Sequence, residues 1–451
     1  MREDPSNKYD NFTTDYRYTA TTMTVSQGYC PACQGRTFTN DTLGRQVAAA
    51  NLESGTVSYT YDGVGNVLTR TDGRGIVSTY TYDGLNRPLS VSYSDGTPAV
   101  SYTYDGVANG MGQLTSVGNL YSTTSFTAFD ALQSVTASKQ VTTGSAYTFG
   151  YGYNLAEALT SETYPSGRVV KTGYDAANRQ VSVNGSLNGQ TTNYVTGTVY
   201  WANGGVTSMT RGNGLVYGET YNSRLQMAGI SEKLNSSSVW NFGLGWVNPT
   251  TSANNGTLQS ATLVTGGLTL SQTFAYDNVN RLLSANENGA WGQAYAYDAW
   301  GNMWMPASSL PAPVIGPGMP TANVYTSQTS GGTNRNVNST YDGAGNLTVF
   351  GSVNVSYDAE SRQTMAGANS YYYDGLGQRV ENVLPGGTTV YAYDAFGKLI
   401  AEYSTAVVGS VCTTCYLSWD HLGSVRMVTD GGGTVKALHD YAPFGQEIPS
   451  G

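Results

Sequence analysis

Four cysteines are the residues best suited by type and spacing to do chemistry. They form two Cys-x-x-Cys pairs, Cys30 with Cys33 and Cys412 with Cys415. Two such pairs could supply the four thiolates of a structural zinc site, but zinc modules keep both pairs within one short segment. Here the pairs lie near opposite ends of the chain. Disulfides, which suit an exported protein, are favoured, while zinc ligation and free or redox-active thiols stay open.

Two histidines each stand beside an aspartate, His421 next to Asp420 and His439 next to Asp440. Such a pair could act in acid–base catalysis, but a structural role is favoured, in which His421 hydrogen-bonds to hold the terminal turns. The carboxylates of Asp420, Asp430 and Asp440 leave self-cleavage near the C-terminus open. No nucleophile pattern of a serine hydrolase is visible. We expect no metabolic activity, no cofactor and no bound metal.

The composition favours a β protein rich in turns. The 451 residues include 56 glycines and 35 tyrosines, only 12% are charged, and the net charge is −9. Glycine and tyrosine replace the lysine, leucine and glutamate of long helices, and the aromatic content argues against disorder. The acidic balance argues against nucleic acid as a partner. No run of residues is long and apolar enough for a membrane span, and we find no export signal in this chain.

One short motif recurs along the chain. It consists of tyrosine and aspartate, then a tight turn with Gly-Asn or Asn-Arg, then an apolar residue. The aspartates Asp62, Asp83 and Asp105 are 21 and 22 residues apart, which is the length of a supersecondary unit. The clearest members of the repeat are Tyr61, Asp62, Gly65, Asn66, Tyr82, Asp83, Arg87, Tyr104, Asp105, Tyr276, Asp277, Arg281, Tyr297, Asp298, Tyr341, Asp342, Tyr373, Asp374, Tyr393 and Asp394.

The motif predicts a β-hairpin. Tyr59 and Tyr61 lie on one face of a strand because side chains alternate, and we expect them to stack on tyrosines of neighbouring strands. The aspartate ends the strand by accepting hydrogen bonds from its own backbone, and Gly or Asn takes the left-handed position of the turn. A single hairpin cannot bury its aromatic face. The repeats therefore predict an all-β solenoid of stacked hairpins, coiled into a shell or tube.

The repeat pattern divides the chain into three parts. We expect an N-terminal segment at 1–39, the repeat solenoid at 40–410 and a terminal segment at 411–451. The match is weak over 184–267, which predicts an interruption of the solenoid. The proline-rich stretch 306–320 cannot join a strand ladder, and we expect a surface connection there, with a plug that projects inward as the less favoured alternative.

These motifs resemble those of the Rhs and YD-repeat family, which includes the toxin-complex C components and the extracellular part of teneurins. The repeat around Tyr61 and Asp62 is close to the family's repeat. The segment that contains Asp420, His421, Gly423, Arg426, Pro443, Phe444 and Gly445 is similar to the family's core-closing signature. The resemblance implies a β-solenoid wound into a hollow shell around a C-terminal cargo, usually a toxin. Many members cleave themselves after this signature, but the downstream cleavage motif is absent here.

We therefore expect a secreted or surface-exposed bacterial shell protein that encloses a toxin and helps to deliver it in competition between cells. The alternative is an extracellular structural or adhesive filament of stacked solenoids. In that case the Cys30 pair of one copy would meet the Cys412 pair of the next. The expected partners are a protein cargo or copies of the chain itself, with cell-surface glycans a further candidate.

Overall fold

The fold is all-β, as the sequence predicted. The computed structural model describes residues 13–28, 34–298, 300–307, 320–325, 333–406, 409 and 411–448. Within these ranges every regular element is a strand. Neighbouring strands pair in antiparallel fashion, and most pairs are consecutive in the chain. No helix in this part of the chain could cross a membrane.

Strands β1 to β25 belong to one 25-stranded sheet, in which pairing follows the order of the chain. The residues group into two compact units. The first comprises Met1–Tyr151, Ala299–Asn302 and Val324–Val407, and the second comprises Gly152–Asp298, Met303–Asn323 and Val408–Gly451. The division at 39/40 and 410/411 follows the repeat pattern, which this grouping does not test, and it stays a prediction.

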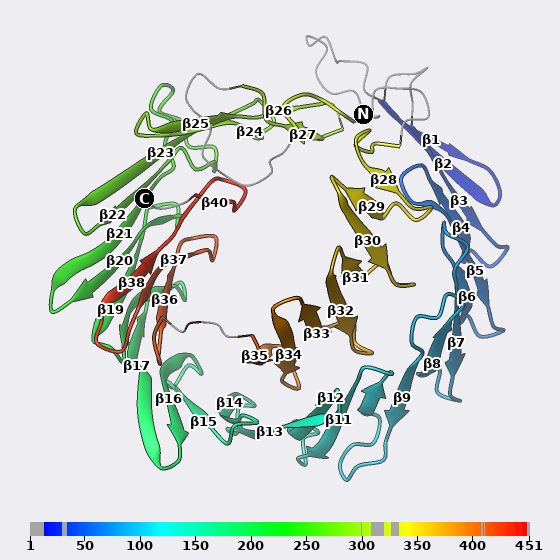
Figure 1. Cartoon of the computed structure of the whole chain (residues 1–451), viewed down its shortest axis with the longest axis horizontal. Helices are drawn as coiled ribbons and strands as arrows, with labels where there is room; N and C mark the ends of the chain where they lie inside the picture. The colour runs from blue at the N-terminus through cyan, green and yellow to red at the C-terminus, as the bar shows by residue number, and fades with distance from the viewer. Residues whose placement is uncertain are drawn as a thin grey trace. The chain divides into compact units, whose positions relative to one another are not determined.

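The first unit contains two series of hairpins. Strands β28 to β35 form an eight-stranded sheet of their own. In Figure 1 they run, in yellow to orange, alongside the blue and cyan strands of the same unit. The strands are β1 (Thr13–Tyr18), β2 (Thr22–Gly28), β3 (Gln34–Asn40), β4 (Gln46–Asn51), β5 (Gly55–Tyr61), β6 (Val67–Thr71), β7 (Val77–Tyr82), β8 (Pro88–Tyr93), β9 (Val100–Tyr104), β10 (Leu114–Gly118), β11 (Ser122–Phe129), β12 (Val135–Thr142), most of β13 (Ser145–Tyr153), β28 (Thr340–Tyr341), β29 (Leu347–Phe350), β30 (Val353–Tyr357), β31 (Gln363–Ala366), β32 (Asn369–Tyr373), β33 (Arg379–Leu384), β34 (Gly387–Tyr393) and β35 (Leu399–Ser404).

The second unit repeats this plan with a short second series. Its C-terminal strands, red in Figure 1, run along the green strands of the same unit. The strands are β14 (Leu159–Thr163), β15 (Val169–Tyr174), β16 (Gln180–Leu187), β17 (Gln190–Tyr200), β18 (Val206–Arg211), β19 (Leu215–Tyr221), β20 (Met227–Leu234), β21 (Ser237–Gly245), β22 (Ser260–Thr265), β23 (Leu268–Tyr276), β24 (Leu282–Glu287), β25 (Trp291–Ala294), β26 (Ala296–Tyr297), β27 (Met303–Trp304), β36 (Tyr416–Trp419), β37 (Val425–Thr429), β38 (Val435–Leu438), β39 (Asp440–Tyr441) and β40 (Glu447–Ile448).

The motif aspartate closes its hairpin as predicted. Asp62 Oδ1 accepts the backbone N–H groups of Val64, Gly65 and Asn66 at 2.8–3.0 Å. Its Oδ2 accepts the side-chain amide of Asn66 at 2.8 Å. Gly65 has φ of 103°, a left-handed conformation that costs glycine little. The same backbone and side-chain contacts recur at Asp83, Asp277, Asp342 and Asp358, with arginine or asparagine four residues after the aspartate. At Asp374 the backbone N–H of Gln378 makes the turn bond.

Arginine links several of these turns to the next hairpin. Arg87 donates to Asp83 at 2.7 Å and lies 4.3 Å from the ring centre of Tyr104. It also forms a bidentate pair with Asp105, at 3.0 and 2.7 Å. Arg281 stands in the same way between Asp277 and Tyr297. The charge and the ring face therefore join consecutive hairpins through a cation–π contact.

The predicted stack of tyrosine rings is wrong at Tyr61. Its ring lies against Arg45, with 4.8 Å between the guanidinium carbon and the ring centre, and its hydroxyl donates to the Gln46 carbonyl at 2.6 Å. An arginine at this height over the ring occupies the space that a second ring would need. The tyrosine hydroxyl makes the same kind of bond to the preceding hairpin at Tyr82, Tyr276, Tyr297, Tyr373 and Tyr393.

The weakly matching stretch 184–267 does not interrupt the sheet, contrary to the prediction. Strands β16 to β22 pair in order through it. Asn222 replaces the motif aspartate, because its Oδ1 also accepts the N–H groups of Arg224 and Gln226. The stretch contributes an apolar cluster in which Trp240 and Phe242 are buried. Most of the proline-rich stretch, 308–319, lies outside the described residues.

Candidate functional site

The turn after β36 carries the residues of the terminal signature. Asp420 Oδ1 accepts the N–H groups of Leu422 and Ser424 at 2.9 and 3.0 Å, and its Oδ2 accepts Arg426 Nε at 2.8 Å. Gly423 takes the left-handed position of this turn with φ of 85°. The signature is therefore one more hairpin of the repeat, with its arginine displaced to the sixth residue after the aspartate.

Arg426 joins two aspartates inside the second unit. Its Nη1 donates to Asp440 Oδ1 at 2.7 Å, while its Nε holds Asp420. All three side chains are less than 10% exposed. The guanidinium also lies over the rings of Phe242 and Tyr441, at 5.5 and 4.9 Å. Arg426 therefore ties β36, β37 and β39 to strand β21 of the long sheet.

Two residues of the long sheet complete this cluster. Gln272 on β23 donates to Glu287 Oε2 at 2.9 Å and to Asp440 Oδ1 at 3.4 Å. Glu287, at the end of β24, is 5% exposed. Burial raises the pKa of Glu287, and the nearby Asp440 carboxylate raises it further. Asp440 therefore links the Arg426 guanidinium to the Gln272 amide, which also binds Glu287.

A second buried ion pair lies on the neighbouring strands. Arg211 at the end of β18 is 2.8 Å from Glu232 on β20, and both side chains are less than 5% exposed. Arg211 Nη1 also donates to the Leu417 carbonyl of β36 at 2.6 Å. Burial raises the pKa of Glu232, and the Arg211 charge opposes that shift. Arg211 thus fastens β36 to the long sheet, and Glu232 balances its charge.

The histidine–aspartate pairs that the sequence left as the less favoured alternative do not form. His421 stacks on Phe242 with 5.9 Å between ring centres, and burial lowers its pKa. Its buried Nδ1 has no hydrogen-bond partner among the described residues, so the expected anchoring bond is absent at that atom. His439 instead lies 2.6 Å from Glu447. Of the three candidate carboxylates, Asp420 and Asp440 converge on Arg426, whereas Asp430 pairs with Lys436 at 3.0 Å.

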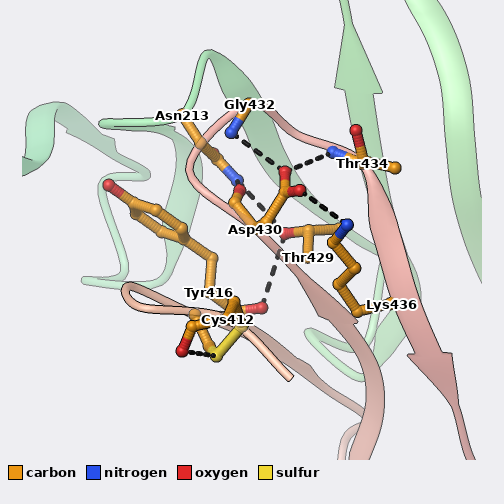
Figure 2. The surroundings of a disulfide bond; sticks show 9 residues. Asn213, Cys412, Tyr416, Thr429, Asp430, Gly432, Thr434 and Lys436 are labelled. Atoms are coloured by element: carbon orange, nitrogen blue, oxygen red, sulfur yellow. Dashed lines mark hydrogen bonds and ion pairs between the residues drawn. A yellow bond between two sulfur atoms is a disulfide. The ribbon is translucent and has the colours of Figure 1, made fainter. Parts of the chain in front are cut away.

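The disulfide prediction is confirmed for the second cysteine pair. Cys412 and Cys415 are bonded to each other with their Cα atoms 5.5 Å apart, immediately before β36 (Figure 2). The bond consumes the two thiolates that a four-cysteine zinc site would take from this pair, and it gives no support to a cysteine joint between copies. Cys30 and Cys33 lie outside the described residues.

Figure 2 also shows how the strand after the disulfide is held. Asn213 of the long sheet donates to Thr429 Oγ1 at 3.1 Å and to the Asp430 carbonyl at 3.0 Å. Thr429 in turn donates to the Tyr416 carbonyl at 3.4 Å. The remaining signature residues close the next turn. Phe444 packs edge-on against Tyr295 at 5.1 Å, and Gly445, two residues after Pro443, has φ of 84°.

Sequence reasoning did not find Arg211, Glu232, Gln272 and Glu287. A signal was present in the alternation of the strands. Glu232 lies two residues after the buried Ile230, and Glu287 two residues after the buried Ala285. Residues two apart share a face of a strand, so both carboxylates had to point into the apolar side.

The comparisons with known proteins agree with this geometry. Residues 61–98 match the RHS repeat. The resemblance seen in the sequence is thus confirmed by an RHS repeat at these residues and by the fold, which is that of the TcdB2–TccC3 shell. No curated protein matches the chain.

Solved structures of toxin complexes share the fold. The structure of TcdB2–TccC3 without its hypervariable C-terminal region has a TM-score of 0.75 at 15% identity and covers 97% of this chain. TcdB2–TccC3–Cdc42 has a TM-score of 0.75 at 14% identity and covers 96%. The Tc holotoxin pore of Photorhabdus luminescens with a TccC3 variant gives 0.74 at 14% and 96%. The matched region is 27% of the length of each of those chains.

Proposed function

We propose that the chain builds part of the wall of a YD-repeat shell that encloses a protein cargo, a toxin, and helps to deliver it in competition between bacteria. The observation that carries the proposal is the shared fold with TcdB2–TccC3 over 97% of the chain. One of those structures lacks a hypervariable C-terminal region and another includes Cdc42. Delivery of this kind places the protein outside the cell that makes it.

Some strands away from the apolar cluster and the covering strands have the burial expected of a wall one sheet thick. Strands β5 and β15 contain no fully buried residue, and β16 contains one. A sheet packed on both faces would instead bury nearly continuous apolar runs. Both faces of such a wall can contact protein or solvent. Polar and aromatic side chains on the inner face would accept an unfolded or partly folded chain without one dedicated site.

The charged cluster suits the same role. Arg426 and Arg211 each bind groups of the C-terminal strands and of the long sheet. A wall that must keep a cargo in place needs its last strands fixed to the earlier ones. In this proposal the cluster holds the C-terminal strands in place and is not a catalytic centre, because each carboxylate oxygen of Asp420 accepts hydrogen bonds from N–H donors.

Protease protection of a cargo tests the proposal. A small folded reporter is fused after residue 451, and the fusion is treated with a non-specific protease. We expect the fused reporter to survive while an equal amount of unfused reporter, mixed with the same chain, is degraded. Degradation of both at one rate, with the β wall still intact by circular dichroism, would contradict the proposal. Binding of cell-surface glycans stays a prediction.

A further inference from the structure

The turns of the second hairpin series in the first unit are covered by the first series. We call the motif turns at Asp342, Asp358, Asp374 and Asp394 the covered row. Arg74, in the turn between β6 and β7, donates to the carbonyls of Asp358 and Ala359 at 2.9 and 3.1 Å. Thr97, between β8 and β9, accepts the Ala359 N–H at 2.9 Å.

The same contact recurs along the row. Asn119, between β10 and β11, donates to the Tyr373 carbonyl at 2.8 Å. Gln140 on β12 donates to the Tyr391 carbonyl at 2.8 Å and accepts the Tyr393 N–H at 2.9 Å. The edge of the first series that lies opposite its own motif turns therefore forms a seam with the motif turns of the second series.

The first series presents an equivalent row that is open. We call its motif turns at Asp41, Asp62, Asp83 and Asp130 the open row. The residue two positions after each aspartate is apolar and extends into solvent: Leu43 is 74% exposed, Val64 75%, Leu85 72% and Leu132 69%. The longer loop after Asp105 interrupts this row between Leu85 and Leu132. The equivalent residues of the covered row are less exposed, Leu376 at 48% and Phe396 at 58%. The four side chains of the open row form an apolar edge of the kind that marks an interaction surface.

Glycines make the contrast between the rows quantitative. A Cβ atom on Gly343, after Asp342, would lie 2.2 Å from the Gly73 carbonyl oxygen, and one on Gly375 would lie 2.7 Å from side-chain carbons of Val100 and Val117. The matching glycines of the open row, Gly63 and Gly84, have nothing within 4 Å of such an atom. Gly63 and Gly84 would thus allow another backbone to approach the open row closely, but no segment of the described chain does so.

A surface that fits the open row lies on the second hairpin series of the same unit. Within the described part of the chain, the turns of β28 to β35 that face away from the seam form a second free edge, whose exposed apolar residues include Phe350 at 53%, Val353 at 39% and Leu384 at 39%. Hairpins on both edges recur every two strands, at about 10 Å. The two free edges therefore match in spacing and in apolar character.

We propose that the open row of one chain docks on the Phe350–Leu384 edge of a second copy, which continues the seam already formed inside the first unit. The direction of the contact follows from the seam, in which the motif turns of one series meet the edge of the other series that carries no motif turns. The contact joins two different surfaces, so it adds copies head to tail. It needs no cysteine and stands independently of the cargo proposal.

Sedimentation of two complementary variants tests this contact. Val64→Lys with Leu85→Lys alters the open row, and Phe350→Glu with Leu384→Glu alters the opposite edge. We expect the wild-type chain to form larger species as its concentration rises, each variant alone to be monomeric, and an equimolar mixture to stop at the dimer. Only a head-to-tail contact produces that dimer, because each variant keeps one intact edge.

Leu68→Lys with Leu89→Lys is the matched control. These residues lie in the same hairpins on the strands β6 and β8, at 38% and 39% exposure, and away from the turns. The control should associate as the wild type does. A wild-type chain that stays monomeric at its solubility limit would overturn the proposal, and so would open-row variants that associate normally while circular dichroism shows them folded.

Discussion

The carbonyl oxygen of Gly73 and the α-carbon of Gly343 approach so closely that a methyl group on Gly343 would lie 2.2 Å from that oxygen. The two glycines belong to different hairpin series of the first unit and are 270 positions apart in the sequence. The seam between the series therefore depends at this point on backbone packed against backbone.

Gly343→Ala is expected to destabilise the protein by about 1–3 kcal/mol, because one of two backbones must shift to make room for the new methyl group. Urea unfolding followed by tyrosine fluorescence measures the change. Gly63→Ala is the matched control, since Gly63 follows its motif aspartate in the same way and has open space around it. Equal losses in both variants would show that the turn, and not the seam, is responsible.

The stability of the first unit should fall as the pH rises from about 4 to about 6. Burial raises the pKa of Asp374 to about 6, whereas an aspartate of the unfolded chain titrates near about 4. The folded protein binds this proton more readily, so its stabilising effect is present at low pH and is lost as the pH passes the folded pKa. Asp374→Asn should abolish this part of the pH dependence and raise stability at pH 7 by up to about 3 kcal/mol.

Asp83→Asn should act in the opposite direction. The backbone N–H of Arg87 lowers the pKa of Asp83, so this carboxylate stabilises the fold above its ordinary pKa and loses that effect on acidification. We expect the variant to be less stable than wild type at pH 7, with the difference vanishing in acid. Thermal unfolding of both variants across the pH range distinguishes a covered aspartate from an open one; matching profiles would remove the distinction.

Arg426→Leu should cost about 3–5 kcal/mol, because it leaves Asp420 and Asp440 buried without their cation. Arg179→Leu removes a partner of Asp175 whose side chain is 42% exposed, and such pairs contribute about 1 kcal/mol or less. Hydrogen exchange of β36 to β38 gives the local readout. If exchange in these strands is unchanged in Arg426→Leu, the cluster does not fasten them.

Serine at both Cys412 and Cys415 should lower stability by no more than about 2 kcal/mol, since a disulfide that closes so short a loop restricts the unfolded chain little. Non-reducing electrophoresis should show no link between chains through these two sulfurs. Intact mass before and after reduction should differ by two hydrogens for this pair. Chain-to-chain bridges lost only in the double variant would contradict the closed loop of Figure 2.

The hairpins were predictable because each is encoded within about 20 residues. Tyr61, Asp62 and Gly65 carry the strand end, the turn bonds and the left-handed position without help from distant residues. The arginine contacts of the repeat were not foreseen, although Arg87 stands at a fixed place after Asp83. The spacing of the repeat shows that a residue type recurs at one position, but it does not show which residue of the next hairpin its side chain contacts.

The seam and the charged cluster could not be predicted, because their partners are far apart in the chain. Gln272 and Asp440 meet across 168 positions, and Arg74 and Asp358 across 284. The hairpin at Asn222 was also missed, because asparagine stands there in place of the motif aspartate. Local signals fixed the secondary structure in these places, whereas the pairing of distant turns depends on how many hairpins lie between them.

From Arg74 onward, the seam partners lie closer together in sequence toward the end of the first unit. The separation is 284 positions at Arg74 and Asp358, 254 at Asn119 and Tyr373, and 244 at Tyr151 and Ala395. The later series therefore covers the same distance with fewer residues per hairpin. The number of hairpins, and not the length of each, therefore decides which turns of the two series meet. Trimming a strand leaves every later partner in place, whereas deleting one complete hairpin would mismatch all the turns beyond it.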